Sequence, residues 1–239
     1  MLYCPSFDTS NFLANVLAAF RERGARDISV VYPYGQTEAG PFISVTRFAD
    51  TANHPGTVGM PMPGIDVAIL DDECLEVRNG EVGEICVRSL ALMSGYLDNP
   101  KATAEAFKGG WLHTGDLGRI DTAGFLVIVD RKKDMVRTGA ENVYAKEVEQ
   151  VLSTHPAVAD CAIVGLPDPD YGEKVVAAVI ATPGMQLREA EVIGFVRERI
   201  AGYKAPRHIV LVAEFPKTSL GKIQKNVLKQ ILARSLGES

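Results

Sequence analysis

The sequence changes character at the run Asp130-Arg131-Lys132-Lys133, and this change limits how the chain can fold. Before the run, between Gly56 and Val129, glycine and proline separate short apolar stretches, which is typical of a small β-rich unit. After it, helical patterns alternate with β-rich stretches, as in a compact α+β unit of about a hundred residues. The sequence therefore predicts two domains, residues 1–130 and residues 131–239, with a junction near Lys133.

Hydrophobic periodicity places much of the secondary structure. In the first domain we expect helices at Asn11–Arg23 and Pro100–Phe107 and strands at Ile28–Val31, Ile65–Leu70, Glu84–Arg88 and Phe125–Val129. In the second domain we expect helices at Ala145–Thr154, Arg188–Ile200 and Asn226–Leu236 and strands at Val158–Leu166, Lys174–Thr182 and His208–Ala213. A strand that runs into the polar turn Tyr34–Glu38 is a common point of ligand contact in α/β folds.

The composition is that of an ordinary globular protein, with 46% hydrophobic and 23% charged residues. The net charge of −5 gives no sign of a nucleic-acid partner, which would require a basic patch. No apolar run exceeds strand length, so we expect no membrane span. Residues 1–5 lack the basic region of a signal peptide, and we therefore expect a cytoplasmic protein.

The cysteines are too far apart to suggest a metal site. No C-x-x-C pair occurs, which favours buried small hydrophobes or unpaired thiols over metal ligands. The four residues are Cys4, Cys74, Cys86 and Cys161.

Several motifs occur in a fixed order along the chain. They are Tyr34-Gly35-Gln36-Thr37-Glu38, Gly83-Glu84-Ile85-Cys86-Val87-Arg88 with Gly95-Tyr96, Gly110-Trp111-Leu112-His113-Thr114-Gly115-Asp116, Asp130-Arg131-Lys132-Lys133-Asp134, Thr138-Gly139-Ala140-Glu141-Asn142-Val143 with Glu147-Val148-Glu149, and Pro216-Lys217-Thr218-Ser219-Leu220-Gly221-Lys222. Together they resemble the later core motifs of the adenylate-forming superfamily of acyl-CoA synthetases, peptide-synthetase adenylation domains and luciferases. The resemblance covers nearly the whole chain from about Val30 onward.

This resemblance implies a combined α/β and α+β fold. The first domain would be the C-terminal part of a large AMP-binding domain, comprising the end of its α/β subdomain and its β-rich subdomain. The second would be a small α+β lid domain. The match of Lys133 to the family's hinge position implies that the lid rotates there; the alternative is a plain surface lysine.

The polar turn after the first strand carries groups suited to ATP chemistry. Glu38 offers a carboxylate, the hard oxygen ligand that Mg²⁺ prefers, and the Thr37 hydroxyl can bond an α-phosphate. The resemblance implies that Tyr34, Gly35 and Gln36 line the adenine side of the pocket. Read alone, Thr37 and Glu38 also fit a helix N-terminal capping pair.

A carboxylate and an arginine are the candidate ribose ligands. Asp116, expected in a turn after Trp111, can accept both ribose hydroxyls. The alternative is a turn aspartate that bonds its own backbone. The resemblance implies that Arg131 contacts the ribose or phosphate, whereas the residues alone allow a solvated basic run.

Two residues of the second domain are candidates for the two chemical steps. A flexible ammonium such as Lys222 can bridge the incoming carboxylate and the phosphate oxygens, although a surface hairpin lysine is the alternative. The resemblance implies that the Gly139 loop borders the pantetheine channel, where a glycine permits close approach of the backbone. Ala140 and Ala145 replace a glycine and a proline that are frequent in the family, and neither change removes a reactive group.

Two tyrosines match aromatic positions near the CoA nucleotide in some acyl-CoA ligases. Tyr171 precedes Gly172-Glu173, and Tyr203 precedes Lys204. Packing is the alternative role for both residues.

The resemblance implies an AMP-forming acyl-CoA ligase. Its parent enzyme would convert a carboxylic acid and ATP to an acyl-adenylate and transfer the acyl group to CoA, with Mg²⁺ bound. The small apolar run Ala39–Phe42 permits a fatty or an aromatic acid. The family's upstream phosphate-binding loop does not occur in these 239 residues, so we expect the chain alone to be inactive and to need the N-terminal part of the same enzyme.

Two other functions remain open from the sequence. A non-catalytic nucleotide-binding module would also lack the phosphate-binding loop. A peptide-synthetase-type adenylation domain would usually continue into a carrier domain, whereas little sequence follows Lys222 and its Gly221–Lys225 ending is closer to CoA ligases.

Overall fold

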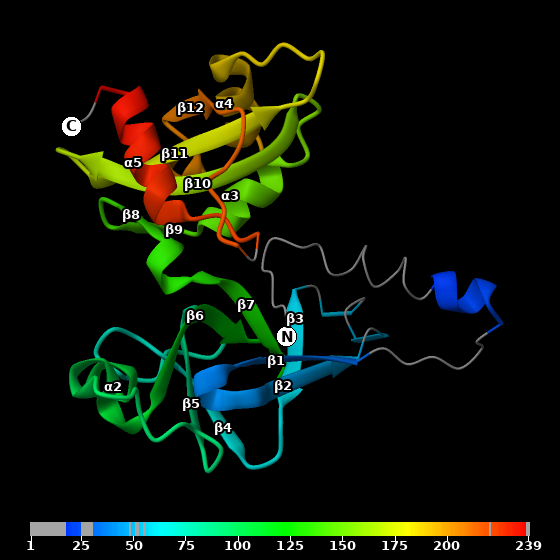
Figure 1. Ribbon diagram of the computed structural model, residues 1–239, viewed down its shortest axis with the longest axis vertical. Coiled ribbons are helices and arrows are strands. Elements are labelled where there is room, and N and C mark those ends of the chain that lie inside the picture. The colour runs from blue at the N-terminus through cyan, green and yellow to red at the C-terminus, as the bar shows by residue number, and fades with distance from the viewer. Residues whose placement is uncertain are drawn as a thin grey trace. The chain divides into compact units, whose positions relative to one another are not determined.

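A computed structural model describes residues 18–24, 31–47, 49–50, 53–54, 56–219 and 221–237 (Figure 1). The chain divides into two compact units, the first ending at Lys132 and the second beginning at Lys133. Each unit combines a β-sheet with helices. No helix among the described residues has both the length and the apolar composition needed to cross a bilayer.

The first unit is built on a seven-stranded sheet in which all neighbouring strands are antiparallel. The strand order is β1-β2-β3-β7-β6-β5-β4. The strands are β1 (Val31–Gln36), β2 (Gly40–Arg47), β3 (Thr57–Pro61), β4 (Ile65–Leu70), β5 (Gly83–Ser89), β6 (Leu112–Ile120) and β7 (Leu126–Arg131). Because β3 pairs with β7, the N-terminal hairpin β1-β2 joins the same sheet as β6.

Among the elements that are described in full, helix α2 and three short 3-10 turns accompany the strands up to the unit boundary. Helix α2 (Pro100–Ala106) begins with a proline at its first position, and the Asn99 side chain accepts a hydrogen bond from the Ala102 amide at 3.1 Å. The 3-10 turns are η1 (Thr37–Ala39), η3 (Lys108–Gly110) and η4 (Lys132–Asp134), which reaches into the second unit. Apolar side chains from β2, β5, β6 and β7, including Ile43, Ile85, Leu112 and Leu126, form the core.

The structure corrects one sequence expectation in this unit and excludes one alternative. Asp116 lies inside strand β6 and not in a turn, because β5 and β7 pair with both edges of that segment. Thr37 and Glu38 do not cap an α-helix; they lie in the turn η1 between two strands, and Gln36 before it makes no side-chain capping bond. The expectations also omitted strands β2, β3 and β6.

The N-terminal expectations fall partly outside the described residues. Of the expected helix Asn11–Arg23, residues 11–17 are not described, while residues 18–22 are helical and Gly24 follows with φ of 87°. Of the expected strand Ile28–Val31, only Val31 is described, as the first residue of β1.

The second unit has a sheet of five strands with strand β11 at its centre. The strands are β8 (Val136–Thr138), β9 (Glu141–Val143), β10 (Val158–Asp168), β11 (Gly172–Ala181) and β12 (His208–Leu211). Strand β11 pairs antiparallel with β10 and β8 and parallel with β12. The helices are α3 (Ala145–Leu152), α4 (Glu189–Arg197) and α5 (Lys225–Ser235), with the 3-10 turn η5 at Gly202–Lys204.

Helices cover both faces of this sheet, because successive residues of β11 point in opposite directions. Val175, Ala177 and Val179 share a core with residues of α3 and α4. The intervening Val176 and Ala178 share another core with residues of α5, which runs across β10 and β11 in Figure 1. Burial on both faces explains why β11 is a continuous apolar run.

Strands β2 and β3 approach closely at Gly59, and Gly64, which also has a positive φ, serves as a control for this contact. Gly59 has φ of 95°, and an added Cβ would overlap the carbonyl group of Val45. Gly64 has φ of 81°, and an added Cβ would meet nothing within 4 Å. We expect Gly59→Ala to destabilise the first unit by on the order of 3 kcal/mol, and Gly64→Ala by only about 1 kcal/mol. Denaturant unfolding checks this; equal losses would contradict the close approach.

Candidate functional site

Asp116 forms the centre of a buried polar cluster in the first unit. Its Oδ2 accepts a hydrogen bond from the Tyr34 hydroxyl at 2.7 Å, and its Oδ1 lies 2.8 Å from Arg131 Nε. The pairing of β6 with β7 places Asp116 directly opposite Arg131, while β1 supplies Tyr34. Tyr34 and Asp116 are only 2% and 3% exposed. The sheet therefore brings together three residues from distant parts of the sequence.

The cluster connects a buried carboxylate to the protein surface. The Arg131 side chain is 36% exposed, whereas that of Asp116 is 5% exposed. Each carboxylate oxygen can accept more than one hydrogen bond. The contacts with Tyr34 and Arg131 therefore hold the Asp116 carboxylate in one orientation, and either oxygen is a group that ligand hydroxyls can donate to.

Glu38 lies in turn η1 and is held from a second loop. Its Oε1 accepts a hydrogen bond from the Tyr96 hydroxyl at 3.1 Å, and its backbone carbonyl accepts one from the Met93 amide at 2.9 Å. Burial, with the hydrogen bond to Glu38 and that residue's negative charge, raises the pKa of Tyr96, so the hydroxyl remains a donor. Tyr96 was absent from the expected site residues, although its Gly95-Tyr96 motif was the available signal.

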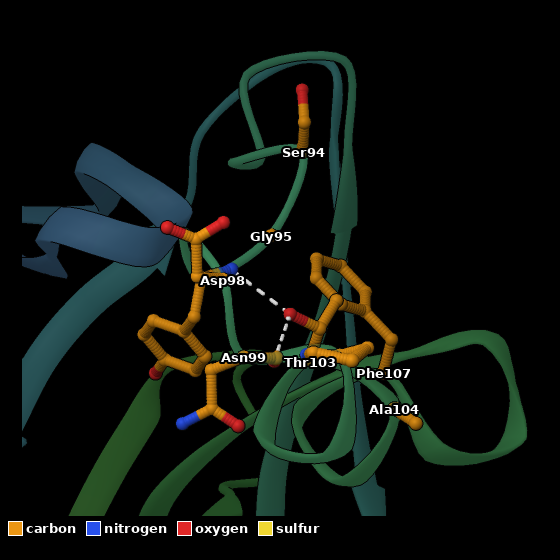
Figure 2. A pocket seen from close by; sticks show the side chains of 9 residues that line it. Ser94, Gly95, Asp98, Asn99, Thr103, Ala104 and Phe107 are labelled. Carbon is orange, nitrogen blue, oxygen red and sulfur yellow. Dashed lines mark hydrogen bonds between the residues drawn. The ribbon is translucent and has the colours of Figure 1, made fainter.

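An open groove of about 660 Å³ lies next to Tyr96. Figure 2 shows its walls, a loop and helix α2, joined by Thr103, which accepts a bond from the Tyr96 amide and donates one to the Asn99 carbonyl, both at 2.9 Å. The lining residues are Ser94, Gly95, Tyr96, Asp98, Asn99, Pro100, Thr103, Ala104 and Phe107. Asp98 is the charged residue among them, so the groove has little to attract a phosphate.

Gly35 and Gln36 end strand β1, and Thr37 begins the turn η1, where the chain passes close to the facing strand β2. Gly35 permits this arrangement, since a Cβ there would lie 2.6 Å from the carbonyl oxygen of Pro41 on the facing strand. Gln36 is half-buried, and Thr37 is exposed with its hydroxyl at the turn.

In the second unit, the Gly139 turn contacts Tyr171. Gly139 has φ of 63°, a conformation that favours glycine, and its amide donates to the Tyr171 carbonyl at 2.7 Å. The Arg207 guanidinium lies 4.4 Å from the centre of the Tyr171 ring and 4.0 Å from Asp168 Oδ2. Arg207 was not among the expected site residues, because no sequence pattern connects it to Tyr171.

The remaining expected residues are exposed. Tyr203 is 47% exposed on η5, where the neighbouring Lys204 pairs with Glu147 at 2.7 Å. Lys222 follows Gly221, which has φ of 78°, in a turn closed by the bond from the Thr218 amide to the Lys222 carbonyl at 2.8 Å. No side-chain hydrogen bond connects Tyr203 or Lys222 to the Gly139 turn in the described part of the second unit.

Lys133 is also exposed. Its side chain forms neither an ion pair nor a hydrogen bond with any residue that the structure describes.

Two protein-family models match the chain in sequence order. The model of AMP-binding enzymes matches residues 11–97, and that of the AMP-binding enzyme C-terminal domain matches residues 147–222. The Asp116 and Arg131 pair lies between the two matched stretches.

A sequence relative and two solved structures agree with these matches. The long-chain-fatty-acid–CoA ligase of Escherichia coli O157:H7 is 42% identical over 196 residues, covering 82% of this chain and 35% of the relative. ATP-bound MatB from Rhodopseudomonas palustris has a TM-score of 0.77 and 35% identity, covering 84% of this chain and 40% of that chain.

The o-succinylbenzoate CoA synthetase of Bacillus subtilis, in complex with an acyl-adenylate intermediate, also has a TM-score of 0.77. Its identity is 32%, covering 90% of this chain and 43% of that chain. This chain therefore spans about two fifths of the length of the proteins that it matches. The predicted combination of α/β and α+β structure is confirmed, and the chain belongs to the AMP-binding family of adenylate-forming enzymes.

Proposed function

We propose that this chain carries the nucleotide-binding and lid parts of an AMP-forming acid–thiol ligase, an acyl-CoA synthetase. The observation that carries the proposal is the buried Tyr34–Asp116–Arg131 cluster in a chain that both AMP-binding family models match. The names of the relatives support acyl-CoA formation, since they include a long-chain-fatty-acid–CoA ligase and an o-succinylbenzoate CoA synthetase.

In this proposal the first unit binds ATP and the adenylate. Asp116 accepts the ribose hydroxyls, held in place by Tyr34 and Arg131. Tyr34, Gly35 and Gln36 border the adenine, and the exposed Thr37 hydroxyl donates to the α-phosphate.

Glu38 fits a magnesium ligand in this proposal, because its carboxylate offers hard oxygen donors. Tyr96 bonds Oε1, while Oε2 has no hydrogen-bond partner among the described residues. Bound Mg²⁺ would offset phosphate charge during adenylation.

Adenylation and thiolation would use different residues of the second unit. In adenylation, an oxygen of the acid attacks the α-phosphorus and pyrophosphate leaves; the Lys222 ammonium offsets the negative charge that develops. In thiolation, the CoA sulfur attacks the acyl carbonyl and AMP leaves. The Gly139 turn borders the path of the thiol, with Tyr171 and Tyr203 placed for the CoA nucleotide.

The proposed acid is a fatty or an aromatic carboxylic acid. Ala39 is buried and Phe42 is 46% exposed, so this stretch offers apolar surface without a charged group that selects one acid. The names of the relatives include both a fatty-acid and an aromatic-acid ligase.

We place the hinge of the lid at Lys133. The two preceding residues are tied to the first unit: Arg131 to Asp116, and Lys132 Nζ to Asp72 at 2.7 Å and Glu84 at 2.9 Å. Lys133 has no such contact with the residues that the structure describes, so rotation of the backbone there would break none of the ion pairs seen among them. Rotation of a lid is an established way to present two faces to one cleft.

Binding of a non-hydrolysable acyl-adenylate analogue tests the nucleotide site in the 239-residue chain. We expect the wild type to bind and Asp116→Asn to weaken binding by about 10- to 100-fold, since it removes hydrogen bonds to a charged group. Asp66→Asn, an exposed carboxylate on β4, is the control and should bind like the wild type. Calorimetric titration measures all three affinities.

Absence of binding by the wild type would overturn the nucleotide site. Binding combined with no turnover of acid, ATP and CoA by the complete enzyme would instead support a non-catalytic module. A complete enzyme that releases pyrophosphate but transfers the acyl group to a carrier protein and not to CoA would support a peptide-synthetase-type domain.

Two substitutions in the complete enzyme separate the half-reactions. Lys222→Ala should slow adenylation by about 10²–10³ while largely sparing transfer from a supplied acyl-adenylate to CoA. Gly139→Leu should do the reverse, because its side chain would enter the thiol path. Pyrophosphate release and CoA-thioester formation measure the two rates.

Matched controls distinguish these effects from damage to the fold. Lys217→Ala removes an exposed lysine close to Lys222. Gly184→Leu introduces the same kind of backbone strain at φ of 80°, with nothing within 4 Å of an added Cβ. Equal slowing of both half-reactions by Lys222→Ala would contradict its assigned role.

Limited trypsin digestion tests the hinge. The first cut that separates two stable fragments should fall after Lys133, because Arg131 and Lys132 are held in ion pairs and Lys133 is exposed. Lys133→Gln should slow this cut, and mass spectrometry identifies its position. A first cut within residues 145–236, with the junction intact, would contradict the hinge.

A further inference from the structure

Strands β5 and β6 bring a glutamate, a cysteine and a histidine together outside the Asp116 cluster. Cys86 and His113 are direct partners across the two strands, and Glu84 lies two residues before Cys86. The ligand atoms of Glu84, Cys86 and His113 all lie within 4.8 Å of one another. Glu84 is 4% and Cys86 0% exposed, so the group is built into the sheet and is not a cluster of surface acids.

The His113 ring is oriented as in a metal site. Its Nδ1 lies 2.9 Å from Glu84 Oε2 and 3.4 Å from Cys86 Sγ. Its Nε2 lies 3.0 Å from the Lys108 carbonyl, to which it donates. Histidines that bind metals commonly donate their second nitrogen to a carbonyl or carboxylate in this way. A carboxylate oxygen and a sulfur therefore converge on Nδ1, which makes three different ligand atoms in one group.

The charges of the group permit a divalent cation to enter. A dication that binds Nδ1, Sγ and the Glu84 carboxylate displaces the proton of the thiol, so that one thiolate and one carboxylate together balance its charge. Lys132 Nζ also contacts Glu84 Oε2, at 2.9 Å, but a second carboxylate, Asp72, holds it at 2.7 Å.

We propose that Glu84, Cys86 and His113 form a binding site for a divalent transition metal of the zinc type. A thiolate with an imidazole selects Zn²⁺ or Co²⁺ over Mg²⁺, which distinguishes this site from the one proposed at Glu38. Cys74 Sγ lies 3.8 Å from Nε2, which is the nitrogen that faces away from the site, so water completes the coordination.

The pKa values of Cys86 and Glu84 bear on metal binding in different ways. Burial, together with the charge of Glu84, raises the pKa of the Cys86 thiol to about 12. A coordinating metal deprotonates a thiol outright. Burial would raise the pKa of Glu84, but hydrogen bonds from His113, Lys132 and the Gly115 amide outweigh it and lower that pKa.

The role of such a metal would be structural. It would join β5 to β6 in the stretch of β6 that also carries Asp116, and would resist separation of the two strands. The site does not depend on the ligase proposal, since it needs the sheet and not the nucleotide.

Titration of the 239-residue chain with Co²⁺ tests the proposal, since Co²⁺ reports a thiolate ligand by a charge-transfer absorption band. The wild type should show this band at stoichiometric metal, and Zn²⁺ should remove it. Cys86→Ala should abolish the band and weaken Zn²⁺ binding by about 10- to 100-fold in a competition with a chromophoric chelator. Cys4→Ala and Cys161→Ala are the thiol controls and should retain the band.

A second measurement covers the case in which Cys86→Ala fails to fold. Thermal unfolding of the wild type should shift to higher temperature with Zn²⁺ and not with Mg²⁺, because the ion binds only the folded sheet. Absence of the thiolate band in the wild type would overturn the proposal. So would loss of the band in Cys161→Ala or Cys4→Ala, or unchanged Zn²⁺ affinity in a folded Cys86→Ala.

Discussion

The pairing of strand β6 with β5 on one edge and β7 on the other is the constraint on which the first unit depends. It places Asp116 opposite Arg131 on β7 and His113 opposite Cys86 on β5. The buried Asp116 cluster and the proposed metal site therefore both depend on the position of β6 between its two neighbours. A shift of register along β6 would disrupt both, because neighbouring side chains of a strand point to opposite faces.

Ion pairs hold the last two residues of the first unit, Arg131 and Lys132. Arg131 bonds Asp116, and Lys132 contacts Asp72 and Glu84. Asp116 and Glu84 are buried carboxylates, so loss of either cation would leave a buried charge without its ion-pair partner. The hinge that we propose at Lys133 begins after these contacts, at a side chain with no comparable contact among the described residues.

In the second unit, β11 has a similar central position. Its alternating side chains pack against helices on both faces, while its first residue, Gly172, pairs with Thr138 next to the Gly139 turn. The carbonyl of Tyr171 holds that turn, and Arg207 covers the tyrosine ring. A rigid sheet thus presents a short turn whose shape needs glycine, which suits a proposed boundary for a thiol path.

The sequence by itself determined the elements that have strong local signals. Strand β4 matches its expected bounds, and helices α3, α4 and α5 lie within the expected ranges apart from Lys225, because periodicity and capping act over a few residues. Motif order also determined the family. The tertiary structure alone placed Asp116 in a strand, joined Cys86 to His113 and Glu38 to Tyr96, and covered Tyr171 with Arg207. These contacts depend on strand register and on the packing of segments distant in the sequence, which no local pattern of residues encodes.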